Sequence, residues 1–272
     1  MTTTLTARDL PVDVDLPEGS GSSPWRQAQV LARRSLIKTW RTPEALIDVT
    51  LQPIIFLALF TYVLGGAIAG GSQQQYLQFL LPGLLGQTIA MASVSLGQNL
   101  NADIEKGVFD RFRSLPISRS APLVGAVLAD LVRYVILFAV MISVGTLMGF
   151  DPVSAGGVLA ALALSMAFAL CFGWISVYVG MLVRTPGAVQ GIMFLLIFPL
   201  AFGSNVFVST ETMPGWLQAF VDVNPISHLV SAVRGLMTGG PVAGHVGWTL
   251  VWMAVLLVVF APLAVRAYRR RA

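Results

Sequence analysis

The chain has 272 residues, of which 56% are hydrophobic and only 11% are charged, and its mean hydropathy is +0.77. Soluble domains carry about 25% charged residues, so this composition excludes a water-soluble fold and predicts an all-α polytopic membrane protein. The formal net charge of +4 does not indicate a nucleic-acid partner, because the basic residues flank apolar segments, as they do on the cytoplasmic side of a membrane.

The amino-terminal region divides into a tail and a basic helix. Residues 1–23 are polar and rich in Thr, Asp, Pro, Gly and Ser, which predicts a disordered cytoplasmic tail. Residues 24–41 predict an amphipathic helix that lies in the membrane interface, with apolar residues on one face and basic residues on the other. The residues that we assign to the lipid contact of this interfacial helix are Trp25, Arg33, Arg34, Lys38 and Trp40.

Six apolar segments follow, each long enough to cross a bilayer. A helix needs about 20 apolar residues to span the ~30 Å hydrocarbon core. With the interfacial helix, these segments predict one transmembrane domain over residues 24–268. The predicted spans are about 45–65, 77–98, 123–150, 155–183, 187–207 and 246–265. The segment 101–121 between the second and third spans is charged and is predicted to be cytoplasmic.

The stretch 208–240 contains two short predicted helices, about 214–222 and 225–238, which are too short to cross. Asn at an N-cap followed by Pro at the first helical position is a favoured helix start. The stretch either re-enters the membrane or lies on its outer surface. Its candidate residues are Asn224, Pro225, Ser227 and Arg234. Arg234 could bind a lipid headgroup or an acidic substrate, but pairing with Glu211 or Asp222 is the favoured interpretation.

The orientation follows from the positions of Lys and Arg, which favour the cytoplasmic side. All of them except Arg133 and Arg234 fall in segments that six crossings place on one side. A seventh crossing through 208–240 would put the basic carboxyl end outside. We therefore expect both termini in the cytoplasm.

Three stretches carry a family resemblance. They are the segment from Glu105-Lys106-Gly107 to Leu115-Pro116, the run Asn224-Pro225-Ile226-Ser227 with Arg234-Gly235 after it, and the interfacial helix. In this order and in these places, they resemble the permease subunit of type-2 ABC exporters, the group that contains the daunorubicin-resistance permeases. The resemblance covers residues 24–268, which would then form the permease domain.

The resemblance implies a multi-pass protein of the bacterial plasma membrane that exports a hydrophobic or amphipathic compound: a drug, a polyketide, a lipid or a glycan precursor. It implies a second permease, identical or related, and two copies of a separately encoded ABC ATPase that binds ATP and Mg²⁺. The sequence agrees with ATP binding on a separate subunit. A phosphate-binding loop needs Gly-x4-Gly-Lys-Ser/Thr, and no such run is present, so we expect neither enzyme activity nor a cofactor on this chain.

The segment after the second span is the candidate ATPase-docking element. Phe109 and Phe112 lie one helical turn apart with Arg111 and Arg113 beside them, and an aromatic anchor with an Arg rim concentrates binding energy at an interface. The alternative is an ordinary basic loop whose Phe residues touch lipid, and docking is favoured over it. The assigned residues are Glu105, Lys106, Gly107, Phe109, Asp110, Arg111, Phe112 and Arg113.

The candidate substrate pathway combines polar residues of the second span with aromatic residues of the fifth. These residues are Gln87, Thr88, Phe194, Phe198 and Phe202. For any one of them, ordinary helix packing is the stronger interpretation. Asp130 and Arg133 are spaced to pair on the third span, which favours a structural ion pair near the cytoplasmic interface over a functional one.

Two other classes of membrane protein fit less well. A membrane-embedded enzyme needs ionisable residues grouped in its spans, and only Asp48, Asp130 and Arg133 come close. An ion-coupled secondary transporter usually has a mid-membrane carboxylate and an internal repeat, and the sequence has neither feature. His228 and His245 are expected to lie far apart, so no metal site is predicted.

Overall fold

The computed structural model describes residues 43–68, 72–106 and 121–271, and this part of the chain is helical, without a strand. The predicted tail 1–23, the interfacial helix 24–41 and the docking residues from Gly107 onward lie outside the described residues. The first four elements are α2 (Pro43–Leu59), the π-helix η1 (Phe60–Leu64), α3 (Gly65–Ile68) and α4 (Gln73–Ala92). The next four are α5 (Val94–Glu105), α7 (Ala121–Leu147), α8 (Ala155–Leu182) and α9 (Pro186–Phe202). The last four are η2 (Thr210–Thr212), α10 (Gly215–Val223), α11 (Pro225–Thr238) and α12 (Ala243–Arg271).

Four helical stretches are long and apolar enough to cross a membrane. They are Gln73–Glu105, Asp130–Leu147, Ala155–Leu182 and Ala243–Tyr268. The first and fifth predicted spans correspond to the shorter apolar stretches Leu51–Leu64 and Pro186–Phe202. A cap fixes the start of α9, where Thr185 Oγ1 accepts the Ala188 N–H at 3.4 Å, and Pro199 and Gly203 mark its end.

The second predicted span differs most from its expected limits. It continues as helix to Glu105, so residues 101–105 are helical rather than part of a loop. A turn at Ser93 divides it into α4 and α5. The extra length is helical because its polar residues find partners: Asn101, for example, is buried and bonded to the end of α8.

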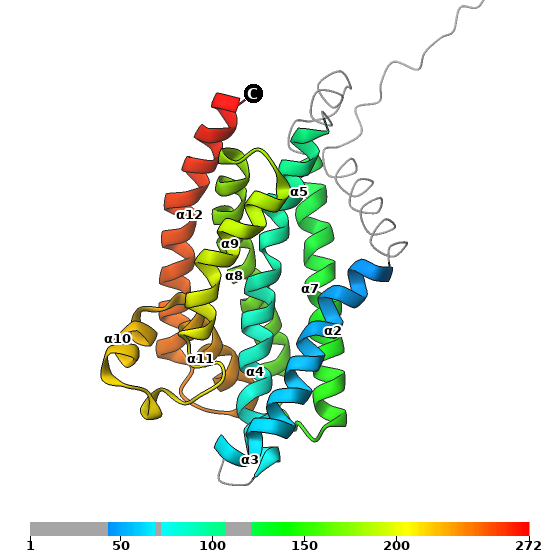
Figure 1. The fold of residues 1–272 in the computed structure, drawn as a ribbon. Coiled ribbons are helices and arrows are strands. Elements are labelled where there is room, and N and C mark those ends of the chain that lie inside the picture. Colours follow the sequence, from blue (N-terminus) through cyan, green and yellow to red (C-terminus); the bar gives the residue numbers. More distant parts are fainter. Residues whose placement is uncertain (1–42, 69–71, 107–120, 272) are drawn as a thin grey trace, which may run out of the picture.

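The core of the bundle is built around α8, which packs against α12, α5, α11 and α4. Large side chains from several helices are fully buried there: Leu80, Leu85, Ile89, Tyr134, Phe168, Phe172 and Leu229. Figure 1 shows the ends of α5 and α12 at one end of the bundle, and α3, α10 and α11 at the opposite end. The short helices α10 and α11 occupy the positions of the two short helices predicted in 208–240.

Candidate functional site

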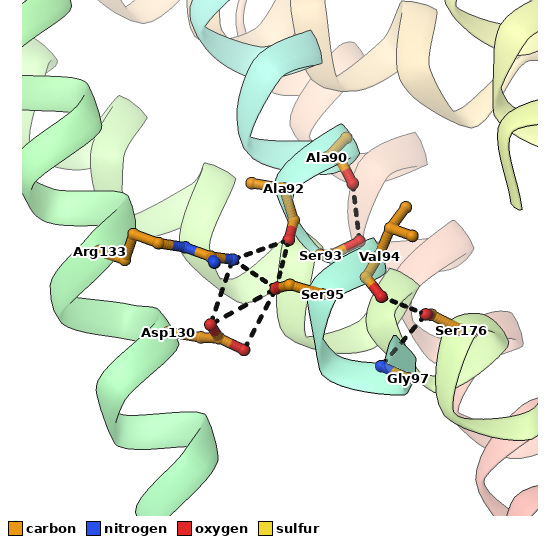
Figure 2. Close-up of polar contacts among 9 residues, drawn as sticks. All are labelled: Ala90, Ala92, Ser93, Val94, Ser95, Gly97, Asp130, Arg133 and Ser176. Atoms are coloured by element: carbon orange, nitrogen blue, oxygen red, sulfur yellow. Dashed lines mark hydrogen bonds and ion pairs between the residues drawn. The ribbon is translucent and has the colours of Figure 1, made fainter. Parts of the chain in front are cut away.

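The turn between α4 and α5 leaves backbone carbonyls that other helices use. Ser93 Oγ donates to the Ala90 carbonyl at 2.6 Å, a local bond that competes with regular helix bonding. Helix α4 ends at Ala92 and α5 begins at Val94. The carbonyls of Ala92 and Val94 accept side-chain bonds from α7 and α8, respectively (Figure 2).

An ion pair on α7 reaches this turn. Arg133 Nη2 lies 3.1 Å from Asp130 Oδ1, so the pair predicted from the spacing is present. The same nitrogen donates to the Ala92 carbonyl at 3.1 Å and makes a short hydrogen bond to Ser95 Oγ. Figure 2 shows Ser95, Asp130 and Arg133 converging on the turn. We call Ser95, Asp130, Arg133 and the Ala92 carbonyl the clasp.

The opposite side of α5 is bonded to α8. Ser176 Oγ donates to the Val94 carbonyl at 2.6 Å and accepts the Gly97 N–H at 3.2 Å. Asn101 Nδ2 donates to the carbonyls of Gly180 and Val183, both at 2.8 Å. Small residues let the two backbones approach closely, as is usual where membrane helices pack tightly. Helix α5 is therefore held on one side by α7 and on the other by α8.

The three side chains of the clasp lie on α5 and α7, the two helices that flank the predicted docking segment. Helix α5 ends at Glu105, with Lys106 next, and both residues are exposed. Helix α7 begins after residues 107–120, which contain the other docking residues: Gly107, Phe109, Asp110, Arg111, Phe112 and Arg113. Ten residues separate Ser95 from Glu105, about 15 Å along a helix. The side chains of the clasp therefore lie on both helices that adjoin the predicted docking segment.

The predicted pathway residues occupy two different environments. Gln87 is 5% exposed, and its Oε1 has no hydrogen-bond partner among the described residues. Thr88 is partly buried on the same helix. Phe194, Phe198 and Phe202 are 55%, 43% and 47% exposed on α9. The polar residues of α4 thus lie inside the bundle, and the aromatic residues of α9 face outward.

The exposed Phe residues belong to a longer series of ring contacts. From α9 the centroid distances are 5.2 Å for Phe194–Phe198, 4.5 Å for Phe198–Phe202 and 5.4 Å for Phe202–Phe207. The series continues at 4.8 Å to Phe60 of η1 and at 6.0 Å to Phe56 of α2. We call these six residues the aromatic face. The i, i+4 spacing within α9 and from α2 into η1 is visible in the sequence, but the contact of Phe60 with Phe207 is not.

Arg234 does not have the partner that we expected from the sequence. Its Nε donates to the Phe79 carbonyl at 3.0 Å, and its Nη2 donates to the Asn205 carbonyl at 2.8 Å. The guanidinium carbon lies 3.7 Å from the centroid of the Phe79 ring. The expected pairing with Glu211 or Asp222 is wrong: both of these residues are exposed, whereas the guanidinium points between α11 and α4.

The start of α11 is fixed to the end of α9. Asn224 Oδ1 accepts the Ile226 N–H at 2.9 Å, and Asn224 Nδ2 donates to the carbonyls of Leu200 at 2.6 Å and Gly203 at 3.2 Å. Pro225 occupies the first turn of α11. Ser227 is 2% exposed, and its hydroxyl has no partner among the residues described. Asn224 therefore ties α9 to α11 as well as capping a helix.

The two histidines are closer than expected. The rings of His228 and His245 are 6.1 Å apart, because α11 packs against α12, and His228 also stacks on Trp248 at 5.6 Å. His228 Nε2 lies 2.8 Å from the Asp222 carbonyl, so it donates to that oxygen. Within the described ranges, no three His, Cys, Asp or Glu residues are grouped to hold a metal ion.

A bundle of apolar helices with a partly buried clasp and a partly exposed aromatic face defines an α-helical integral membrane protein. The chain belongs to the ABC-2 type transporter family, whose sequence model matches residues 26–238. It is therefore a membrane permease of the ABC transporter class.

Several curated proteins are similar over most of their length. A daunorubicin resistance ABC transporter permease protein, DrrB1, of Streptomyces coeruleorubidus is 43% identical over 260 residues, which cover 93% of this chain and 91% of that protein. A probable doxorubicin resistance ABC transporter permease protein, DrrC, of Mycobacterium tuberculosis is 27% identical over 94% of this chain and 93% of its own. A putative transport permease, ycf38, of Cyanophora paradoxa is 25% identical over 76% of this chain and 72% of its own.

Proposed function

We propose that this permease forms the membrane part of an ATP-driven exporter in the bacterial plasma membrane, with two copies of a separate ABC ATPase bound at residues 105–113. The clasp carries the proposal, because it joins α7 to the α4–α5 turn, and α5 and α7 are the helices that enter and leave the docking segment. ATP-driven closure of the partner would move α5 and α7, and the clasp would pass that motion to α4. The sequence contains no Gly-x4-Gly-Lys-Ser/Thr run, so in this proposal the partner binds the ATP.

The proposed topology has six crossings and both termini in the cytoplasm. The crossings are α2 with η1, α4 with α5, α7, α8, α9 and α12. Helices α10 and α11 lie at the outer end, where they complete the short span of α9. The common end of α5 and α12 supports this arrangement, because α12 ends in the basic run after Ala264 and α5 leads into the basic docking segment (Figure 1).

The aromatic face is the proposed contact with a second permease and with the substrate. Apolar exposure alone does not drive association in lipid, since lipid tails are equally apolar. Offset and edge-on ring contacts do offer directional attraction, which suits a flat apolar compound moving between two such faces. The resistance named for the daunorubicin and doxorubicin relatives supports a drug-like substrate, and a polyketide, lipid or glycan precursor remains the alternative.

The decisive experiment is co-expression with the proposed ABC ATPase partner, followed by ATP hydrolysis measurements across a panel of aromatic drugs, lipids and glycan precursors. We expect stimulation by aromatic amphipathic compounds. A complex that forms and hydrolyses ATP without responding to any member of the panel would contradict export of these classes.

Replacing Phe109 and Phe112 together by Ala is expected to uncouple the permease from its ATPase. Central aromatic anchors contribute about 2 kcal/mol or more to an interface, so ATPase affinity should fall roughly thirtyfold or more while membrane insertion is unchanged. Co-purification from detergent extracts measures the loss. Arg119→Ala is the control, because Arg119 shares the charged segment but not the aromatic pair. Full recovery of the ATPase with the double variant would refute docking at this segment.

Replacing Phe198 by Ala is expected to weaken substrate binding. A ring contact contributes about 0.5–1.5 kcal/mol, so the compound concentration for half-maximal ATPase stimulation should rise about two- to tenfold. Leu195→Ala is the control, because Leu195 lies on the same helix, is 77% exposed and is not part of the ring series. Equal effects of the two substitutions would mean that the face contacts lipid rather than substrate.

A further inference from the structure

Arg234 is a cation that the structure holds without a carboxylate. Its bonds go to the carbonyls of Phe79 and Asn205, and its flat face covers the Phe79 ring. Among the residues described, no acidic side chain forms an ion pair with it. Ionisable groups within a membrane protein bundle are normally paired with an opposite charge or have a function. An arginine that bonds only carbonyls therefore indicates a functional role.

The guanidinium is wedged at a point where the loop after α9 touches α4. A Cβ on Gly83 would lie 3.1 Å from Arg234 Nη2 and 3.1 Å from the Val206 carbonyl oxygen, which is tighter than usual Cβ contacts, so glycine eases the approach of both groups to α4. A second bond, from Asn205 Nδ2 to Ser231 Oγ at 2.7 Å, ties the same loop to α11 one turn before Arg234. The loop is therefore held against α4 by α11.

This loop carries one end of the aromatic face. Phe207 follows Val206 directly, and its ring joins Phe202 to Phe60. Its carbonyl accepts the Tyr76 hydroxyl at 3.0 Å, from the same helix that carries Phe79. The position of Phe207, and with it the outer end of the face, depends on how the loop lies on α4.

We propose that Arg234 is a positioning residue: it is the latch of an outer gate that residues 203–207 form, and its release opens the outer end of the aromatic face. This rests on the proposed function, which places that end outside. Neutral partners make the latch reversible, because releasing Arg234 leaves no buried carboxylate behind. The freed guanidinium can then bind water or lipid phosphate.

A lysine is a poor substitute in this position. Its ammonium is a point charge on a flexible stem, whereas the planar guanidinium donates in two directions and stacks on a ring at the same time. Arg234→Lys should therefore keep the charge and the fold but hold the loop less tightly. Phe79→Leu removes the ring alone and leaves the backbone carbonyl.

The test uses the single native cysteine. In a Cys171→Ala background, Ser204→Cys places a thiol in the loop at a position that is 2% exposed, and a membrane-impermeant maleimide is applied to intact cells. We expect slow labelling with Arg234 present, labelling about five- to tenfold faster in Arg234→Met, and intermediate rates in Arg234→Lys and Phe79→Leu. Thr238→Val is the control, because that hydroxyl bonds only to the Arg234 backbone carbonyl.

Two readouts separate the latch from general loosening and from wrong topology. In the protein that keeps both Ser204 and the native Cys171, the labelling rate of the buried Cys171 in permeabilised cells should be the same with and without Arg234→Met. A rise in the Cys171 rate that matches the rise at Ser204→Cys would mean global destabilisation. Ala219→Cys on exposed α10 should be labelled in intact cells. If Ala219→Cys is not labelled in intact cells, the proposed orientation is wrong. The labelling rates of Ser204→Cys in permeabilised cells then still test the role of Arg234. Equal Ser204→Cys rates in all folded variants would overturn the proposal.

Discussion

Arg133→Met is expected to destabilise the protein by about 3 kcal/mol, the lower end of the cost of leaving one member of a buried ion pair without its partner, because Arg133 is only partly buried. Asp130 is 5% exposed, and in the variant only Ser95 would remain to bond it among its partners in the clasp. The loss should appear as a lower unfolding temperature in detergent. ATPase bound to the variant should also lose most of its stimulation by substrate, because the clasp no longer links α7 to the α4–α5 turn.

The double variant Asp130→Asn/Arg133→Met distinguishes charge from geometry. Removing both charges takes away the unpaired carboxylate, so the double variant should be more stable than Arg133→Met alone. Its coupling to ATP hydrolysis should nevertheless stay low, since the bonds to Ala92 and Ser95 are gone. Asp151→Asn, an exposed acid in the loop after α7, controls for the charge change. A double variant with full stimulation would show that the clasp only stabilises the fold.

Short-range patterns in the sequence predict part of this site. The i, i+3 spacing of Asp130 and Arg133 permits their pairing, and the Asn-Pro start of α11 places its N-cap at Asn224. Both features depend on neighbours within one helical turn. The i, i+4 spacing likewise indicates the Phe ladder within α9, since residues four apart share a helix face.

The remaining features depend on distant residues. Ser93 is compatible with an unbroken helix, so its local sequence does not predict the turn. The turn depends on Arg133 and Ser176, which donate hydrogen bonds to the carbonyls of Ala92 and Val94. Arg234 bonds the Phe79 carbonyl, 155 positions earlier in the chain, and its guanidinium lies beside Gly83 of the same helix. No periodicity in a single helix encodes such contacts.

Gly97→Leu should be the most damaging single substitution at the α5–α8 contact. A Cβ at this position would overlap the Ser176 carbonyl, which is backbone and cannot rotate away, and the Gly97 carbonyl oxygen already lies 2.7 Å from where a Cβ on Gly180 would be. Overpacking usually costs about 1–3 kcal/mol and more where backbone must move. The helices would have to separate, which also breaks the bonds of Ser176 and Asn101. Little folded protein should be recovered from membranes.

Gly97→Ala tests the same α5–α8 contact if the Gly97→Leu protein does not accumulate. The single methyl group should still lower the unfolding temperature and reduce coupling, whereas Gly247→Ala on α12, where a Cβ meets nothing within 4 Å, should be neutral or stabilise the helix by up to about 1 kcal/mol. A Gly97→Ala protein that unfolds at the same temperature as Gly247→Ala would mean that α5 does not pack on α8 as closely as the structure has it. In that case α5 would move without α8, and the clasp to α7 would be the remaining polar link, among the described residues, from the α4–α5 turn to a neighbouring helix.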